Sequence, residues 1–392
     1  MFSYIMVGGQ FSDDGGRPSG YIRKLYDAMR PFSTGTLING GHFSDLSEVL
    51  PNLKSFPVIF WMPSIPNDKE KLVDRIKIES PRSILVTSKN NLDSRYSFLE
   101  LIARALRIKS NLFVEFVNPE NNPHEILANI YDPLGNCFCS SKDINKVAFS
   151  LISRVYELCR FTRAHSIRED NLKVRPKKAP EEFFSVIKHC AEIFHGLIYP
   201  HSSRPAERFL GNASFRCLDG FPSFRSEGNI FVSRRNIDKR SIGMEGFVQT
   251  ALLNHKGVTI NYVGEHKPSV DTPIQLLLYR YYPKMNFMMH SHTYIQGALY
   301  TENIIPCGAI EEFFEITKIF PDQDEDFIKI NLKGHGSLVM TENLKYLILP
   351  SAEYTPMPER FGYLPTGGGV VYHSRSLLGQ PERHDKYSSY YE

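Results

Sequence analysis

The chain has 392 residues, with 46 Lys and Arg against 43 Asp and Glu, so its formal net charge is only +3. This near balance argues against a dedicated nucleic-acid-binding protein, which would show a strong basic excess. A hydrophobic fraction of 42% with 23% charged residues is typical of a globular protein and excludes a disordered or fibrous chain.

The sequence also allows a prediction of the cellular compartment. No apolar run reaches the roughly 20 residues that a membrane helix needs, and the opening segment MFSYIMVGGQF resembles a first strand more than a signal peptide. We therefore expect a cytoplasmic protein. The six cysteines are too few for a disulfide framework in a chain of this length, and we interpret them as mostly buried thiols.

Residues 1–165 alternate short β-rich runs with amphipathic stretches. This pattern predicts an α/β domain with a doubly wound, Rossmann-like parallel sheet. The expected strands are Tyr4–Val7, Thr36–Ile38, Pro57–Met62, Ser83–Val86 and Leu112–Phe116. The expected helices are Tyr21–Met29, one that begins near Ser44, Asp68–Ile78, Tyr96–Ile108 and Asp143–Phe161.

Polar or glycine-rich segments follow four of these strands, and we expect them to be loops. Ligands of open α/β sheets bind beyond the carboxyl ends of the strands, and a glycine-rich loop that opens a helix can hold a phosphate. One interpretation is a nucleotide-binding site; the alternative is a structural domain whose turns need glycine for geometry alone. The candidate nucleotide-binding residues are Gly8, Gly9, Arg17, Ser19, Gly40, Ser88 and Lys89.

Residues 166–182 are charged, contain two prolines and have no clear period, so we expect a linker here. A second domain is expected over residues 183–350, followed by a tail, 351–392, that is rich in Tyr, Pro and Gly. The pattern of the second domain predicts an α+β arrangement with an antiparallel sheet. Its expected elements are the helix Phe183–His195 and the strands Ile230–Ser233, Thr259–Tyr262, Phe287–His290, Ile328–Leu332 and Ser337–Met340.

Three histidines of this half have the spacing of a metal site. His290 and His292 are two positions apart, so on a strand they point to the same face. His335 stands between two glycines, which let its backbone approach closely. Together the three imidazoles can form the nitrogen face of a catalytic zinc. The alternative is that they are ordinary core or surface histidines.

Four motifs in this order resemble the class II aldolase/adducin family. They are GNASFR at 211–216, PSVD at 268–271, HSH at 290–292 and GHG at 334–336. The resemblance covers roughly residues 179–349. It implies an α/β/α sandwich around a mostly antiparallel sheet, a divalent metal held by His290, His292 and His335, and a homo-oligomer, with a tetramer favoured. We expect the metal to be zinc.

The resemblance also implies catalytic and substrate-binding residues. Asp271 stands where the aldolases have a glutamate that acts as general base, and its alternative role is the N-cap of the helix Ile274–Tyr281. Glu311 is a second candidate acid or base, and its alternative role is to begin a helix. Arg235 stands in place of the usual Thr-Gly turn, where it would bind an anion or be solvated. The expected phosphate- and substrate-binding residues are Asn212, Ser214, Ser233, Arg235, Asn236 and Ser269.

The sequence therefore predicts a metal-dependent enzyme of the lyase type. Aldolase, epimerase or dehydratase chemistry through a metal-stabilised enediolate would act on a phosphorylated sugar or a sugar-nucleotide-like substrate. The N-terminal domain would bind a nucleotide or a sugar nucleotide. The alternative is a non-catalytic, adducin-like scaffold or assembly protein. Adducin-type domains lack the three histidines, which favours the enzyme here. No nucleic-acid or membrane partner is expected.

Overall fold

The computed structural model describes nine stretches of the chain, which form two compact units divided between residues 160 and 161. The described residues are 2–66, 72–93, 95–118, 125–162, 165–169, 181–198, 210–217, 230–254 and 259–356. Within these stretches, no helix combines the length and the apolar character needed to cross a bilayer.

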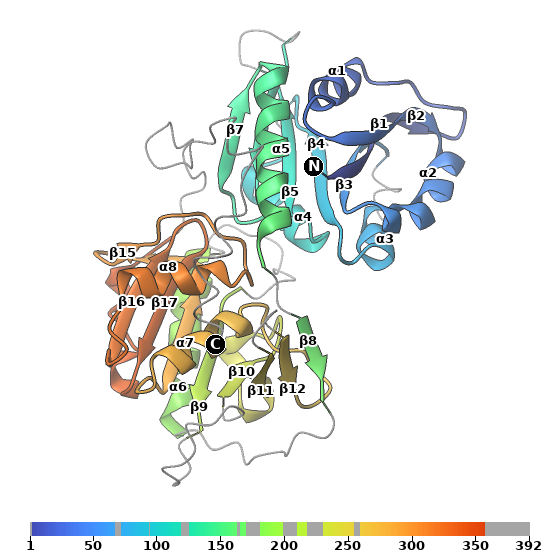
Figure 1. Ribbon diagram of the computed structural model, residues 1–392. Helices are drawn as coiled ribbons and strands as arrows, with labels where there is room; N and C mark the ends of the chain where they lie inside the picture. Colours follow the sequence, from blue (N-terminus) through green and yellow to red (C-terminus); the bar gives the residue numbers. More distant parts are fainter. Residues whose placement is uncertain are drawn as a thin grey trace. The chain divides into compact units, whose positions relative to one another are not determined.

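The N-terminal unit contains a seven-stranded sheet of order β2-β1-β3-β4-β5-β6-β7 (Figure 1). The five strands from β2 to β5 are mutually parallel, as predicted, and β6 and β7 extend the sheet in antiparallel fashion. This antiparallel extension was not predicted. The strands are β1 Ser3–Ser12, β2 Thr34–His42, β3 Val58–Ser64, β4 Ile84–Asn90, β5 Leu112–Val117, β6 Leu127–Tyr131 and β7 Cys137–Ser141.

Helices cover both faces of this sheet, which confirms the doubly wound class. Because side chains alternate along a strand, Ile5 and Val7 of β1 point to one face, where they join the apolar cluster that includes α2 and α3. Tyr4 points to the other face, where its ring meets Tyr26 of α1. The helices are α1 Gly20–Met29, α2 Phe43–Val49, α3 Leu72–Glu79, α4 Phe98–Arg107 and α5 Ile144–Arg160, with the 3-10 helix η1 Leu50–Ser55.

The C-terminal unit contains a nine-stranded sheet of order β15-β16-β17-β13-β9-β10-β11-β12-β8. Only the end pairs β15–β16 and β12–β8 are parallel, so the prediction of a mostly antiparallel sheet is confirmed. Its strands are β8 His165–Arg168, β9 Asn212–Arg216, β10 Ile230–Ser233, β11 Phe247–Asn254, β12 Thr259–Tyr262, β13 Phe287–Ser291, β15 Leu299–Tyr300, β16 Phe327–Leu332 and β17 Gly336–Thr341. A small second sheet pairs β14 Thr293–Ile295 with β18 Tyr354–Pro356.

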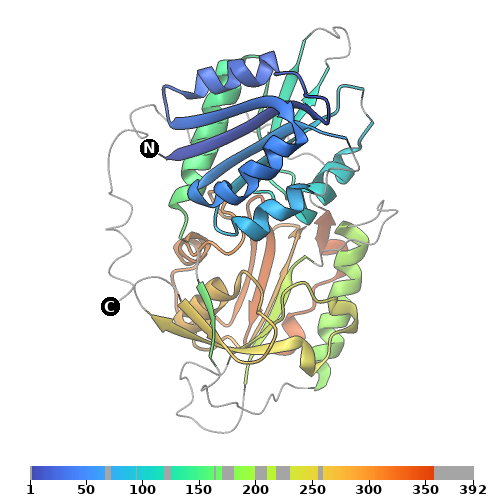
Figure 2. The same cartoon turned by 90° about the vertical axis from the view of Figure 1, so that its right-hand side faces the viewer.

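The sheet lies between two helical layers, as the α/β/α class requires. The helix α6, Glu181–Ile198, packs on one face (Figure 2). There the ring of Phe183 contacts the rings of Phe215 and Phe287. The helices α7, Thr272–Tyr281, and α8, Glu311–Ile319, pack on the other face. The remaining 3-10 helices are η3 Lys239–Ser241, η4 Met244–Gly246, η5 Leu344–Tyr346 and η6 Ser351–Glu353.

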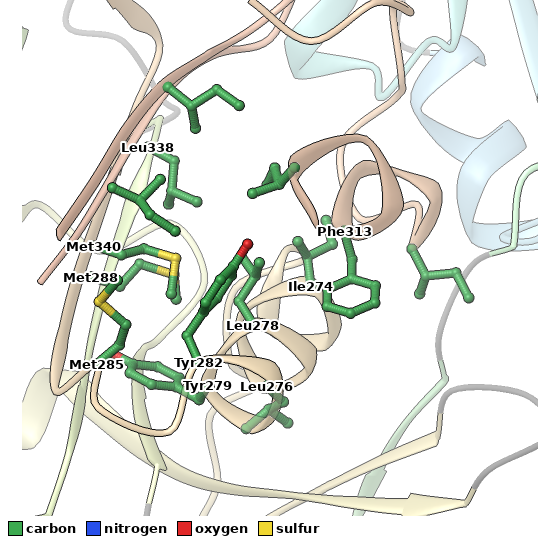
Figure 3. Packing of buried hydrophobic residues seen from close by; sticks show 14 of the residues in the cluster. Ile274, Leu276, Leu278, Tyr279, Tyr282, Met285, Met288, Phe313, Leu338 and Met340 are labelled. Atoms are coloured by element: carbon green, nitrogen blue, oxygen red, sulfur yellow. The ribbon is translucent and has the colours of Figure 1, made fainter. Parts of the chain in front are cut away.

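The core under α7 and α8 determines which strand residues face these helices. Figure 3 shows Met288, Leu338 and Met340 of the sheet directed toward Leu278 of α7 and Phe313 of α8. His290 is two residues beyond Met288 on β13, so it points to the same face. The sheet therefore presents His290 on the side covered by α7 and α8.

The expected linker and tail both contribute strands to this unit. Residues 165–168 form β8, which pairs in parallel with β12, so the chain joins the sheet earlier than expected. Residues 170–180, most of the expected linker, lie outside the described residues. The first residues of the expected tail form η6 and β18, and its remainder from residue 357 also lies outside the described residues.

Candidate metal centre

Three buried imidazoles meet at the C-terminal end of β13. The ring centroids of His290 and His292 are 5.0 Å apart, and those of His290 and His335 are 4.6 Å apart. The structure thus brings together the three histidines that the spacing selects. Gly334 and Gly336, which flank His335, have φ values of 71° and 139°. A Cβ at residue 336 would overlap the carbonyl oxygen of Ser291, so glycine is required for this approach.

The hydrogen bonds of these rings leave nitrogen atoms directed at one another. Nδ1 of His290 lies 2.9 Å from the carbonyl oxygen of Ser337, and Nδ1 of His335 lies 2.7 Å from Oε1 of Glu312. Nε2 of both rings and Nδ1 of His292 are buried without a hydrogen-bond partner. One ring nitrogen from each histidine lies within 4.8 Å of the others. Three unpartnered imidazole nitrogens form a donor set that fits a zinc ion.

The electrostatics of two of the three rings also suit a cation. Burial, together with the neighbouring His335, lowers the pKa of His290 to about 4. Burial and the two adjacent imidazoles hold the pKa of His292 well below its ordinary value. Both rings are therefore neutral near pH 7, the form that binds metals. Burial opposes a charge on His335, but Cys307 and Glu312 outweigh it and raise the pKa of His335 well above its ordinary value.

Asp271 lies at the start of α7 next to this centre, but its side chain makes no capping hydrogen bond. Asp271 thus occupies the N-cap position of the capping alternative, but its carboxylate does not cap the helix. Oδ2 of Asp271 accepts a hydrogen bond from Nδ2 of Asn212 at 2.9 Å, and Asn212 in turn accepts one from Gln275. Oδ1 of Asp271 is buried and has no partner. The ligand atoms of Asp271, Cys307 and His335 lie within 4.8 Å of one another.

The expected phosphate-binding turn lies beside the loop that leads to Asp271. The backbone N–H of Ser269 donates to the carbonyl oxygen of Ser233 at 3.1 Å. Arg235 and Asn236 form an exposed turn at the end of β10, and the N–H of Arg235 donates to Lys267 at 2.9 Å. Asn236 has a φ of 60°, a left-handed conformation that glycine adopts readily and asparagine tolerates.

Two of the expected substrate-binding serines have hydroxyl groups that are engaged inside the protein. Oγ of Ser214 lies 3.0 Å from the phenol oxygen of Tyr279, in the buried layer between β9 and α7. Oγ of Ser233 accepts the N–H of Ala213 at 3.1 Å. Both hydroxyls thus pair within the fold and stabilise the sheet and α7, and their role in substrate binding stays a prediction.

The acidic pair at the start of α8 divides its roles differently from what we expected. The carboxylate of Glu311 accepts the backbone N–H of Thr162 at 3.0 and 3.2 Å, so it holds the chain before β8. Its neighbour Glu312 is buried against His335. Burial raises the pKa of Glu312, and His335 opposes that shift. Consecutive residues of a helix point about 100° apart, so the sequence motif could not decide which carboxylate faces the histidines.

Sequence reasoning missed Lys239 at this centre, and it gave Cys307 no specific role there. Lys239 of η3 is 6% exposed, and its Nζ donates to the carbonyl oxygens of Leu210 and Ile237 at 3.3 and 3.2 Å. Burial lowers the pKa of Lys239 to about 8, while Asp238 and Asp271 oppose the shift. Cys307 lies in the turn before α8. Buried lysines and single cysteines have no sequence signal that distinguishes them from ordinary core residues.

In the N-terminal unit, the glycine-rich segments expected as loops are strands. Gly8 and Gly9 lie within β1, Gly40 within β2, and Ser88 and Lys89 within β4. A Cβ at Gly9 would be 2.5 Å from the backbone nitrogen of Gly40, so these glycines allow β1 and β2 to pack closely.

The start of α1 is likewise held by contacts within the protein. Oγ of Ser19 accepts the N–H of Ile22 at 3.3 Å, and the backbone N–H of Ser19 donates to the side chain of Asn39 at 2.9 Å. The carbonyl oxygen of Arg17 accepts the N–H of Gln10 at 2.8 Å. Residues 8–12 therefore belong to β1, and residues 13–19 form a loop that is hydrogen-bonded to the sheet and ends at the capped start of α1.

Comparison with known proteins agrees with the geometry of the C-terminal unit. Residues 201–345 match the family model of the class II aldolase and adducin N-terminal domain. The match lies in the C-terminal half of the chain, where the four motifs show the resemblance. No curated protein gives a significant match.

Three solved structures are similar to parts of the chain. A DNA/pantothenate metabolism flavoprotein from Streptococcus pneumoniae is 8% identical, with 40% of this chain and 100% of that one covered and a TM-score of 0.31. L-fuculose-1-phosphate aldolase from Thermus thermophilus is 13% identical, with 44% and 83% covered and a TM-score of 0.28. YgbL, a putative aldolase/epimerase/decarboxylase from Klebsiella pneumoniae, is 13% identical, with 42% and 82% covered and a TM-score of 0.26.

Proposed function

We propose that the C-terminal unit is a metal-dependent enzyme of the lyase type that acts on a phosphorylated sugar or a related sugar-nucleotide-like compound. The observation that carries this proposal is the convergence of three unpartnered imidazole nitrogens within 4.8 Å of one another. A non-catalytic scaffold would have no use for such a group of buried nitrogens, since each unpartnered polar atom costs about 1–3 kcal/mol.

His290, His292 and His335 would hold a divalent metal, for which zinc fits the three-nitrogen donor set. The metal would supply Lewis-acid stabilisation of the negative charge that develops on a substrate carbonyl oxygen. Glu312 would fix the ring of His335 through the hydrogen bond to Nδ1. A carboxylate in this position orients the ligand and makes it more basic.

Asp271 would move the proton on the carbon next to that carbonyl. Its Oδ1 atom is buried and unpartnered, so it is available to accept a proton. Asn212 holds Oδ2 and thereby fixes the direction of Oδ1. The buried ammonium group of Lys239 interacts electrostatically with this carboxylate.

The substrate phosphate would bind at the turn formed by Arg235 and Asn236. The guanidinium group can bind phosphate oxygens through two parallel hydrogen bonds. Exposure of this turn leaves it accessible to a ligand, and the bond between Ser269 and Ser233 links it to the loop that carries Asp271. We further propose that the enzyme is a homo-oligomer, with a tetramer favoured, and that the N-terminal unit binds a nucleotide.

Proton exchange tests the proposed chemistry without knowledge of the full reaction. The zinc-loaded protein is incubated in D2O with a panel of phosphorylated ketoses and aldoses, and 1H NMR follows the loss of the proton next to the carbonyl. We expect exchange with at least one member of the panel and none with His335→Ala. Absence of exchange across the panel in a protein that holds zinc would overturn the proposal.

A further inference from the structure

The possible metal-ligand atoms around His335 include more than the nitrogens of the three imidazoles. Asp271, Cys307 and His335 form a second group whose ligand atoms all lie within 4.8 Å of one another. His335 belongs to both groups, so the two are joined at one side chain. We propose that the thiolate of Cys307 is a fourth metal ligand of this centre. The inference rests on the metal site of the proposed function and adds a ligand that the histidine motifs do not contain.

The backbone of the turn before α8 holds Cys307 in this place. The N–H of Ala309 donates to the carbonyl oxygen of Pro306 at 3.1 Å and closes the turn. Gly308 has a φ of +78°, and a Cβ there would be 2.8 Å from the carbonyl oxygen of Val270. The turn therefore packs directly on the residue that precedes Asp271.

The same short segment also supplies the partner of His335. Glu312 lies five positions after Cys307 on α8, and its carboxylate bonds to Nδ1 of His335 at 2.7 Å. The turn before α8 and the first turn of α8 thus present the thiol of Cys307 and the carboxylate of Glu312, which orients the ring. Because the turn continues directly into α8, Cys307 is held relative to His335 more firmly than it would be in an independent loop.

Independent observations indicate a ligand at this side of the centre. Nε2 of His335, which is fully buried, and Oδ1 of Asp271, whose residue is 7% exposed, have no hydrogen-bond partner. Buried polar atoms without partners are rare in folded proteins. Because Oδ2 of Asp271 is held by Asn212, ligation by Cys307 leaves Oδ1 of Asp271 for proton transfer.

The donor chemistry predicts which metals bind well. Three imidazoles and one thiolate are donors that zinc accepts, and expansion to five ligands would keep a place for the substrate oxygen. A thiolate favours zinc and other thiophilic ions over magnesium and manganese, which prefer oxygen ligands. Metal binding would release the proton of the Cys307 thiol to solvent, since only the thiolate is a ligand.

Cobalt substitution tests the inference by a readout that does not depend on activity. The full-length protein is freed of metal with a chelator and titrated with Co2+ while its absorption is recorded. We expect a thiolate-to-cobalt charge-transfer band in the near ultraviolet. Cys307→Ser should bind cobalt without this band and should lose at least about tenfold in affinity for Cd2+. Cys217→Ser, which changes a half-buried cysteine of the same unit, should keep the band.

Two outcomes would overturn the inference while the histidine site stands. In one, the wild-type protein binds cobalt stoichiometrically without the band; in the other, Cys307→Ser retains the band. A wild-type protein that binds no cobalt at all would remove the proposed metal site together with this ligand. If Cys307→Ser is misfolded by circular dichroism, alkylation of the wild type decides. Bound cobalt should protect Cys307 from iodoacetamide, and equal labelling with and without cobalt would refute ligation.

Discussion

Nδ1 of His335 lies 2.7 Å from Oε1 of Glu312, and both side chains are buried. The contact joins α8 to the turn between β16 and β17. It fixes the imidazole so that Nε2 faces the other two histidines. The pair therefore determines how well the proposed metal centre is formed before any metal arrives.

Glu312→Gln should weaken zinc binding by about 10–100-fold, because the ring of His335 loses its anionic partner. Competition with a chromophoric chelator measures the affinity. Glu311→Gln is the matched control, since the Glu311 carboxylate bonds to the backbone of Thr162 and should leave zinc affinity unchanged. A larger loss in the Glu311 variant would reverse the roles assigned to the two carboxylates.

Asp271→Asn should lower the rate of proton exchange by about 10²–10⁴-fold, the usual contribution of a general base. Zinc content should remain as in the wild type, because the three imidazoles are untouched. Elemental analysis and the exchange assay are carried out on the same samples. Loss of zinc together with activity would instead identify Asp271 as a metal ligand.

Arg235→Ala should weaken the binding of a phosphorylated ligand by about 1.5–3 kcal/mol, the range for hydrogen bonds to charged groups. Isothermal titration with the sugar phosphate that shows exchange measures the effect. Lys284→Ala, which removes an exposed cation paired with Asp324, serves as the control for a general change in charge. Equal affinities in all three proteins would place Arg235 on the solvated surface.

The buried Lys239 predicts a specific dependence of stability on pH. Its pKa falls from the ordinary 10.5 to about 8 in the folded protein, so between these values the unfolded chain binds a proton that the folded chain has lost. Within this window the contribution of Lys239 to the free energy of unfolding rises with pH. The free energy of unfolding of wild type, minus that of Lys239→Met, should therefore rise by on the order of 3 kcal/mol as the pH rises through this window.

Denaturant unfolding in the presence of a chelator, across that pH window, measures this difference. Lys284→Met is the control for the loss of an exposed ammonium group. A flat profile for Lys239→Met would show that the lysine titrates normally in the fold.

The strand β8 predicts where the chain can be divided. A fragment of residues 161–392 should fold and form the oligomer, because β8 stays with its partner β12. A fragment that begins at residue 169 should aggregate more readily, since it exposes the edge of β12. Light scattering on both fragments, and on residues 1–160, tests this. A monomeric 161–392 fragment beside an oligomeric 1–160 fragment would contradict the proposed assembly.

The pattern of hydrophobic residues predicted most of the helices and strands that bury one face or both faces. β10 and β12 match the expected Ile230–Ser233 and Thr259–Tyr262 to the residue. The segment at Gly8 failed because glycine has a poor intrinsic preference for strands. Pairing with β2 and β3 on both sides overrides that preference, which no local pattern reveals. β7 at Cys137–Ser141 has only five residues and was also missed, because its pairing with β6 is not visible in its own sequence.

The candidate site shows the same difference between residues that a local sequence pattern identifies and residues that only contacts distant in sequence bring in. The histidines could be found because two of them share a strand and the third lies between glycines. Lys239 and Cys307 could not be found, because each reaches the centre only through contacts distant in sequence. Lys239 is held by Leu210, and the turn at Cys307 is placed by Gly308 against Val270.

The packing of Gly336 against Ser291 also affects how related chains should be judged. Any side chain at residue 336 would overlap the Ser291 carbonyl oxygen and separate β17 from β13, carrying His335 away from His290. A chain could thus retain all three histidines and still be unable to gather them. The catalytic competence of a homologue is therefore better judged from the glycine at this position together with the histidines than from the histidines alone.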